Sequence, residues 1–218
     1  MGAWLRDSSR LLRCVSPDRP RLSLLPSRAK VVTTDPVARA QILHRHPRLE
    51  VELAPERADL LMGLRRGRWQ AACVSPALLE TGWTTTLHVE TIESDEVIPA
   101  VGLGAVAVLV RAGDLRNRER AARINEAATA HLLDAERSFL RHLPRMAGAL
   151  GTARAVRAGD ILKLTGLIVE RDGAWLALDE AEASVRFGEV IACDVASACD
   201  GLANDLRIPS PTPRRAAS

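Results

Sequence analysis

Residues 30–53 read KVVTTDPVARAQILHRHPRLEVEL, and their pattern indicates the fold class of the first half of the chain. It begins with a short valine strand at 31–32, and residues 33–36 supply the polar and proline chemistry of a helix start. A helix over 37–44 follows. Residues 49–53 then alternate apolar and charged side chains with the period of a half-buried strand. The stretch therefore predicts a strand, a helix and a second strand.

The same alternation continues along the chain. A helix is expected over 58–66, followed by a strand over 69–74 whose continuous apolar run indicates burial on both faces. Strand-like sequence returns at 87–92 and again at 97–110. Within the latter, residues 105–110 read AVAVLV, which predicts a central strand. The first half of the chain therefore predicts an α/β sheet.

The second half predicts an α+β module. Apolar positions recur every three or four residues over 116–143, which is typical of one or two amphipathic helices. A loop is expected after them at 146–157. The expected strands and closing helix then lie at 161–169, 174–178, 183–187 and 189–206. The closing helix is expected to point these residues inward: Val190, Cys193, Ala196 or Ser197, Leu202 and Leu206.

Composition excludes several classes of function. The chain has 218 residues, of which 47% are hydrophobic and 26% charged, as in an ordinary globular protein of one or two domains. Aromatic residues are only 3% and the net charge is +3, so we expect no nucleic-acid partner. No stretch approaches the length of a membrane span, and the start lacks a secretory signal. We therefore expect no membrane contact and a cytoplasmic location.

We expect four regions along the chain. An Arg- and Ser-rich leader over 1–29, with the composition of a transit peptide, is expected to be poorly ordered. An α/β module follows over 30–112. A helical connection and an α+β C-terminal domain occupy 113–207, and a proline- and arginine-containing tail over 208–218 is expected to be disordered.

Several stretches resemble one enzyme family. Residues 99–108 read PAVGLGAVAV, which is similar to the P-A-x-G-Q-G-A pattern of hydroxymethylbilane synthase, also called porphobilinogen deaminase. Further matches follow that family's order and spacing at 40–43 (AQIL), 47–51 (PRLEV), 67–71 (GRWQA) and 135–140 (AERSFL). The resemblance covers about residues 30–206. It implies a periplasmic-binding-protein-like α/β module, corresponding to the family's second domain and the return strand of its first, followed by a small α+β domain.

The resemblance also implies where the family's chemistry would lie. That family assembles a linear tetrapyrrole from porphobilinogen on a dipyrromethane cofactor, which is bound by a thioether to one cysteine. The cysteine's place falls at or beside Ala147, and no cysteine occurs between Cys73 and Cys193. The family's H-S-x-K-D-x-P string, which carries its catalytic aspartate, does not occur in this chain. We therefore expect no cofactor, no catalytic residue and a protein without deaminase activity.

Two other functions stay open. The chain is an active or repurposed enzyme on porphobilinogen or another small carboxylate, or it is a binding subunit that completes its fold with another chain or a second copy. A metal is not expected at His44 and His46, because Arg45 and Arg48 flank them and no third ligand is evident.

Candidate binding residues follow from the need to hold carboxylates. The planar fork of arginine suits a carboxylate, and a strand-to-helix turn presents N–H groups to an anion. The family's G-T-S-S-L-R-R segment corresponds to 32–39 here, where Thr33 is an identity. The candidates for a substrate or other anion are therefore Thr33, Thr34, Arg39 and Arg57, with a plain helix cap and solvated arginines as the alternative. Gly102 and Gly104 are expected to be structural, permitting a close turn.

Overall fold

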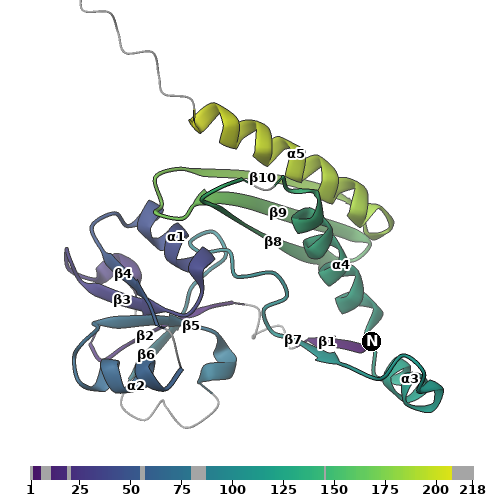
Figure 1. The fold of residues 1–218 in the computed structure, drawn as a ribbon, viewed down its shortest axis with the longest axis horizontal. Coiled ribbons are helices and arrows are strands. Elements are labelled where there is room, and N and C mark those ends of the chain that lie inside the picture. The colour runs from purple at the N-terminus through teal and green to yellow at the C-terminus, as the bar shows by residue number, and fades with distance from the viewer. Residues whose placement is uncertain are drawn as a thin grey trace, which may run out of the picture.

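The computed structural model describes residues 2–5, 11–18, 21–54, 57–79, 87–144 and 146–207. The described chain contains a five-stranded sheet, a three-stranded sheet and a two-stranded ribbon, together with helices (Figure 1). This architecture confirms the α/β class. Within the described ranges, none of the helices combines the length and the apolar character that a membrane crossing requires.

The five-stranded sheet has the order β4-β3-β5-β2-β6. At one side, β3 (Lys30–Thr33) runs parallel to both β4 (Glu50–Leu53) and β5 (Ala71–Val74). At the other, β2 (Arg13–Ser16) runs antiparallel to both β5 and β6 (His88–Thr91). The predicted strand-helix-strand unit over 30–53 is confirmed as β3, α1 (Pro36–Arg45) and β4.

The strand β2 corrects the expectation of a leader over 1–29. Among the described residues of that segment, β2 lies between β5 and β6 in the sheet, and a 3-10 turn at Leu22–Leu24 leads into β3. Val15 of β2 is fully buried, because an inner strand is covered on both faces. The sequence does not predict this strand, because it is only four residues long and lies in a segment rich in arginine and serine. The expected tail at 208–218 lies outside the described residues.

The two helices of this half cover opposite faces of the sheet. Successive strand residues point to opposite faces, so Val31 packs with Ala38 and Ile42 of α1, whereas Val32 packs with Leu60 and Leu64. The latter two lie on α2 (Arg57–Arg65). After α2 the chain turns at Gly67, whose φ of 69° suits glycine, and it enters β5. A 3-10 turn at Pro76–Leu78 follows β5.

The second half is an antiparallel sheet covered on one face by two helices. The helices α4 (Ala127–His142) and α5 (Gly188–Arg207) pack against β8 (Ala149–Ala158), β9 (Ile161–Glu170) and β10 (Leu176–Ser184), with β9 in the centre. A 3-10 turn at Val185–Phe187 connects β10 to α5. The prediction of a loop at 146–157 is wrong, since most of that segment forms β8. The strand expected at 174–178 overlaps the longer β10, whereas the strand expected at 183–187 is wrong beyond residue 184, because Val185–Phe187 forms the 3-10 turn.

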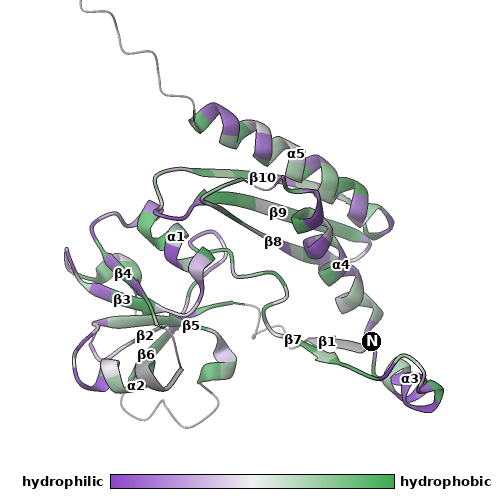
Figure 2. Cartoon of the chain, viewed as in Figure 1, coloured by the Kyte–Doolittle hydropathy of each residue, from purple (hydrophilic) through white to green (hydrophobic). Residues whose placement is uncertain are grey.

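The inward face of α5 differs from the predicted one at most positions, although the prediction for Ala196 is confirmed. Val190, Leu202 and Leu206 are exposed, whereas Ile191, Ala192, Val195, Ala196, Cys199 and Ala203 are buried against the sheet. The buried stripe consists largely of small residues, and larger apolar residues also occur outside it, so hydrophobicity alone pointed to the wrong face. Figure 2 shows hydrophobic and hydrophilic residues on both sides of α5.

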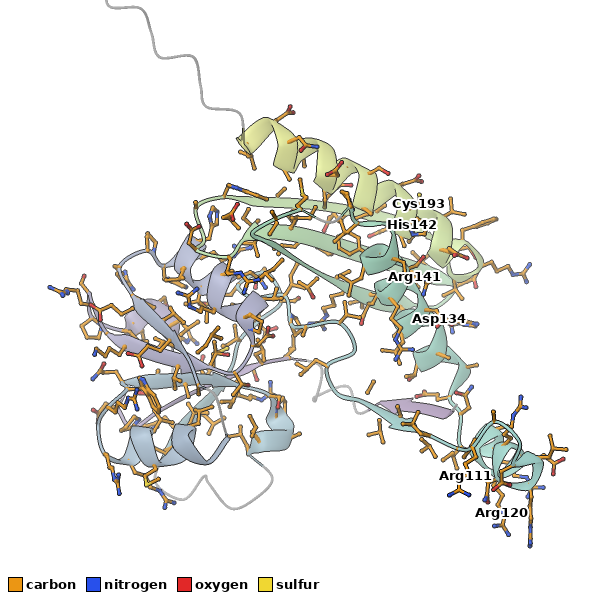
Figure 3. The ribbon with its side chains drawn as sticks, viewed as in Figure 1. Arg111, Arg120, Asp134, Arg141, His142 and Cys193 are labelled. Atoms are coloured by element: carbon orange, nitrogen blue, oxygen red, sulfur yellow. The ribbon has the colours of Figure 1, made fainter. Side chains whose placement is uncertain are left out.

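The third part of the molecule is an arm. Residues Gly2–Leu5 (β1) pair antiparallel with Ala105–Val108 (β7), and α3 (Leu115–Arg123) follows, with Arg111 and Arg120 far from both larger sheets (Figure 3). The prediction of a central strand at 105–110 is therefore wrong. β7 belongs to a two-stranded ribbon, and Val106 and Leu109 are 50% and 82% exposed.

Helix α1 joins the two halves. Its Ala40 is buried with Ile98 and with Leu167 and Val169 of β9. At its end, His44 Nδ1 lies 2.9 Å from the carbonyl oxygen of Gly173, in the turn between β9 and β10. Helix α1 therefore packs against the five-stranded sheet on one side and against the sheet β8-β9-β10 on the other.

Candidate functional site

The strand ends that precede α1 and α2 are the place where an α/β sheet binds ligands. The parallel strands β3 and β4 both end at the same edge, and each is followed by a helix. Thr33, the last residue of β3, is fully buried, and its Oγ1 accepts a hydrogen bond from the Asp35 N–H at 3.2 Å. Thr34 is exposed beside it. The candidate threonines thus lie at this edge, but the Thr33 hydroxyl serves the local turn.

The N-terminus of α1 is capped by a carboxylate of the chain itself. Asp35 Oδ1 accepts a hydrogen bond from the Val37 N–H at 2.8 Å, as an N-cap residue does. A helix N-terminus favours a negative charge, because its N–H groups and dipole point outward. Asp35 already supplies that charge, so a second carboxylate at this position would meet a like charge.

Arg39 lies on the first turns of α1 and contacts main-chain carbonyls. Its Nε donates to the Val51 carbonyl of β4 and its Nη1 to the Arg171 carbonyl of the β9–β10 turn, both at 3.0 Å. The guanidinium therefore connects three parts of the fold. Arg57, the remaining arginine candidate, begins α2, and its side chain lies outside the described part of the chain.

The loop at 98–104 is held by polar side chains that the sequence reasoning did not single out. Gln41 accepts from the Ile98 N–H at 2.9 Å and donates to the Ile98 carbonyl at 2.7 Å, and Thr152 donates to the Pro99 carbonyl at 2.7 Å. Glu136 accepts from the Gly102 N–H at 3.0 Å. Gln41 and Glu136 lie in the AQIL and AERSFL stretches, so the family-like residues were the signal that could have identified them.

The two glycines of this loop adopt the conformation that glycine permits. Gly102 and Gly104 have φ values of 77° and 80°, in the left-handed region. The Gly102 N–H also reaches the carboxylate of Glu136, a residue that is buried on α4. These positions serve the turn that leads into β7.

Ala147 lies exposed in the loop between α4 and β8. Its neighbour Gly148 accepts a hydrogen bond from the Arg171 N–H at 2.9 Å, and the Arg171 carbonyl in turn accepts from Arg39. The structure therefore brings the loop of Ala147 and the candidate Arg39 to the same turn, although they are far apart in the sequence. Thr33 and Thr34 precede the N-terminus of α1, whereas His44 lies near its C-terminus.

The four cysteines lie on β2, β5 and α5, away from the loop of Ala147. Cys14 and Cys73 are opposite each other on β2 and β5, and both are buried free thiols. Burial is the main cause that raises the pKa of Cys14 and of Cys199 to about 12, and it raises the pKa of Cys73 well above its ordinary value. Cys193, labelled in Figure 3, is half-buried on α5. Thiols with such raised pKa values are poor nucleophiles at neutral pH.

The two histidines of α1 and its C-cap have separate partners. His44 Nδ1 meets the Gly173 carbonyl, whereas His46 Nε2 lies 3.1 Å from Glu96 Oε1. Within the described ranges, no group of three or more histidine, cysteine, aspartate or glutamate side chains is placed to hold a metal ion.

Comparison with known proteins gives one consistent family. The model for the dipyromethane cofactor binding domain of porphobilinogen deaminase matches residues 5–119. The porphobilinogen deaminase of Rubrobacter xylanophilus is 37% identical over 153 residues, which are 70% of this chain and 50% of that protein. Those of Syntrophotalea carbinolica and Moorella thermoacetica are 31% and 33% identical over 183 residues, 84% of this chain. The chain spans 50–58% of the length of these relatives.

The family match corrects the expectation that no cofactor is involved, because the matched domain is one that binds dipyrromethane. The structure tests one feature of that match. Ala147, where the resemblance puts the attachment cysteine, has a methyl side chain and cannot form a thioether, so this loop does not fit covalent attachment. The matched residues nevertheless make up more than half of the 218, and the chain therefore belongs to the porphobilinogen deaminase family.

Proposed function

We propose that the chain serves tetrapyrrole biosynthesis as a porphobilinogen deaminase-like protein that does not itself join porphobilinogen units. The relation to this biosynthesis follows from the family. The second part of the proposal is supported by one observation above all, which is the Asp35 carboxylate at the N-terminus of α1. A site for a carboxylate-bearing substrate requires positive charge or free N–H groups at that edge of the sheet.

The other candidates support the same conclusion. Arg39 donates from two nitrogens to main-chain carbonyls, so its fork is directed at the protein. Thr33 is buried and hydrogen-bonded within the turn. Two of the four residues expected to bind carboxylates, Thr33 and Arg39, are thus used to hold the fold. We include in the proposal a periplasmic-binding-protein-like origin of the five-stranded module, which the mixed order β4-β3-β5-β2-β6 supports.

The test is porphobilinogen consumption by the purified protein, with the Rubrobacter xylanophilus deaminase as positive control. We expect the relative to consume porphobilinogen and this chain to leave its concentration unchanged, while circular dichroism shows that the chain is folded. Formation of hydroxymethylbilane by the chain would overturn the proposal. Asp35→Ser keeps a capping hydroxyl and removes the charge, so this variant should bind porphobilinogen several-fold more tightly than the wild type without gaining turnover.

A binding subunit is the second candidate function, and the arm favours it. Val106, Leu109, Leu115 and Ile124 are large apolar side chains exposed on one short segment, and β7 is paired with β1 alone among the described strands. An unpaired strand edge and exposed apolar residues are typical of a surface that associates with another chain. Sedimentation should then show self-association or co-migration with a partner, whereas a clean monomer at all concentrations would contradict this candidate.

A further inference from the structure

The sheet β8-β9-β10 is covered on one face by α4 and α5, whereas its other face is covered only in part. Leu162, Leu164 and Ile168 of β9 point to α4 and α5, and the alternate residues point to the opposite face. On that opposite face, Leu167 and Val169 are buried against Ala40 of α1 and against Ile98. Farther along the strands the cover ends, and Val156 and Ile161 are 46% and 47% exposed.

The uncovered half forms the floor of a hollow of about 720 Å³. Val156, Ile161 and Leu178 supply apolar floor, and Ser94 and Asp95 belong to a wall contributed by the chain between β6 and the loop at 98–104. A volume of this size lies within the range of small-molecule sites, which combine apolar lining with a few polar groups. The hollow is distinct from the edge of β3 and β4 described above.

Charged groups of opposite sign lie at opposite sides of this floor. Arg154 comes from β8, and its Nε and Nη1 atoms are buried. Glu180 and Glu182 come from β10, and Lys163 of the central strand donates to Glu180 Oε1 at 2.8 Å. That hydrogen bond is the largest cause that raises the pKa of Lys163. Lys163 also lies directly opposite Glu182, whose charge is a further cause that raises the pKa of Lys163, so the two carboxylates of β10 share one lysine, and Arg154 stands on the other outer strand.

The register gives the separation of the backbone positions that carry these two charges. Arg154 is opposite Thr165, and Glu182 is opposite Lys163, one row along the sheet. Two interstrand spacings place β8 and β10 about 10 Å apart, and the offset of two residues adds about 7 Å along the strands, so the two backbone positions are about 12 Å apart. A benzene ring that carries a carboxylate at one end and an ammonium group at the other, with one hydrogen bond of about 2.8 Å at each end, spans a comparable distance. Five N–H donors allow an arginine to hold a carboxylate in addition to another partner.

We propose that this hollow binds a small zwitterion with a flat apolar body, whose carboxylate faces Arg154 and whose ammonium group faces Glu182. The apolar floor accepts the ring, and the charges at its two sides orient it. The inference is independent of the proposed function, because it concerns a different surface and requires no turnover.

The probe is 4-(aminomethyl)benzoate, with benzoate and benzylamine as single-charge controls, and binding is followed by titration calorimetry and by chemical-shift changes at neutral pH and low salt. We expect the zwitterion to bind at least about tenfold more tightly than either control, since it uses both charges. Glu182→Gln should reduce its affinity to that of benzoate and leave benzoate itself unaffected. Glu119→Gln on exposed α3 is the matched control and should change nothing.

Arg154→Gln should abolish the advantage over benzylamine, and its fold is checked by circular dichroism because the residue is partly buried. Since Glu182 is exposed, the Glu182→Gln result decides the question if Arg154→Gln does not fold. No saturable binding of the zwitterion at millimolar concentration, equal affinity for all three probes, or equal effects of Glu182→Gln and Glu119→Gln would each overturn the proposal.

Discussion

Glu136 illustrates how this chain uses a buried charge. The residue is only 1% exposed, and its two carboxylate oxygens accept from the Gly102 N–H at 3.0 Å and from the Ala155 N–H at 2.9 Å. A buried carboxylate is costly unless hydrogen bonds compensate its loss of water. Here the compensation comes from main-chain groups of two segments, so the residue connects α4, β8 and the loop before β7.

We therefore expect Glu136→Ala to lower the free energy of unfolding by about 3 kcal/mol, because two N–H groups lose their partner and each such loss costs about 1–3 kcal/mol. Urea denaturation measures the change. Glu119→Ala, an exposed glutamate of α3, is the matched control and should alter stability by less than about 0.5 kcal/mol. A Glu136→Ala protein within 1 kcal/mol of the wild type would show that these hydrogen bonds are dispensable.

Sequence patterns indicate Thr33 and Arg39 as candidates, but they do not reveal the roles of these residues, and they do not indicate Gln41 or Glu136. The stretches AQIL and AERSFL resemble the family in sequence, yet only the contacts show that Gln41 and Glu136 hold the loop at 98–104. Arg39 was a reasonable candidate for a carboxylate, but its partners are carbonyls on β4 and in the β9–β10 turn. Those partners are distant in the sequence, so no local pattern could indicate them.

At the scale of elements, local signals predicted β3, α1 and β4, since alternation and helix-start residues are properties of neighbouring positions. The sequence does not indicate β8, because four alanines and a glycine give it low strand propensity. Tertiary packing explains those small residues. Ala153 is opposite Gly166 of β9, and a Cβ on Gly166 would overlap the Phe139 ring and approach Val195 within 2.7 Å. The close approach of α4 and α5 therefore requires small residues in the strands beneath them.

The opposite error, at 105–110, has a related cause. The segment is apolar and β-branched, and the sequence pattern cannot tell whether another strand will lie beside it. In the structure β7 pairs only with β1 among the described strands, and much of its apolar surface is exposed. Propensity describes the strand itself, whereas burial depends on what packs against it.

At the scale of the whole molecule, the two sheets are connected where α1 meets the β9–β10 turn. The chain passes the turn at Gly173, whose φ is 80°, and a Cβ there would lie 2.8 Å from the His44 main-chain nitrogen and 2.8 Å from Leu43 Cβ. The β9–β10 turn is therefore in van der Waals contact with α1 at Gly173. Arg39 and His44 add hydrogen bonds to this contact, to the carbonyls of Arg171 and Gly173.

This contact predicts that Gly173→Ala uncouples the two halves. The added methyl group forces the turn away from α1, and the left-handed backbone adds about 1–2 kcal/mol of strain. Gly159→Ala is the matched control, because Gly159 has a similar φ of 62° but nothing within 4 Å of its Cβ position. We expect Gly159→Ala to lose only the strain energy and Gly173→Ala to lose at least about 3 kcal/mol. Calorimetry should show one transition for the control and a broadened or split transition for Gly173→Ala, whereas equal, single transitions would mean that the halves do not depend on this contact.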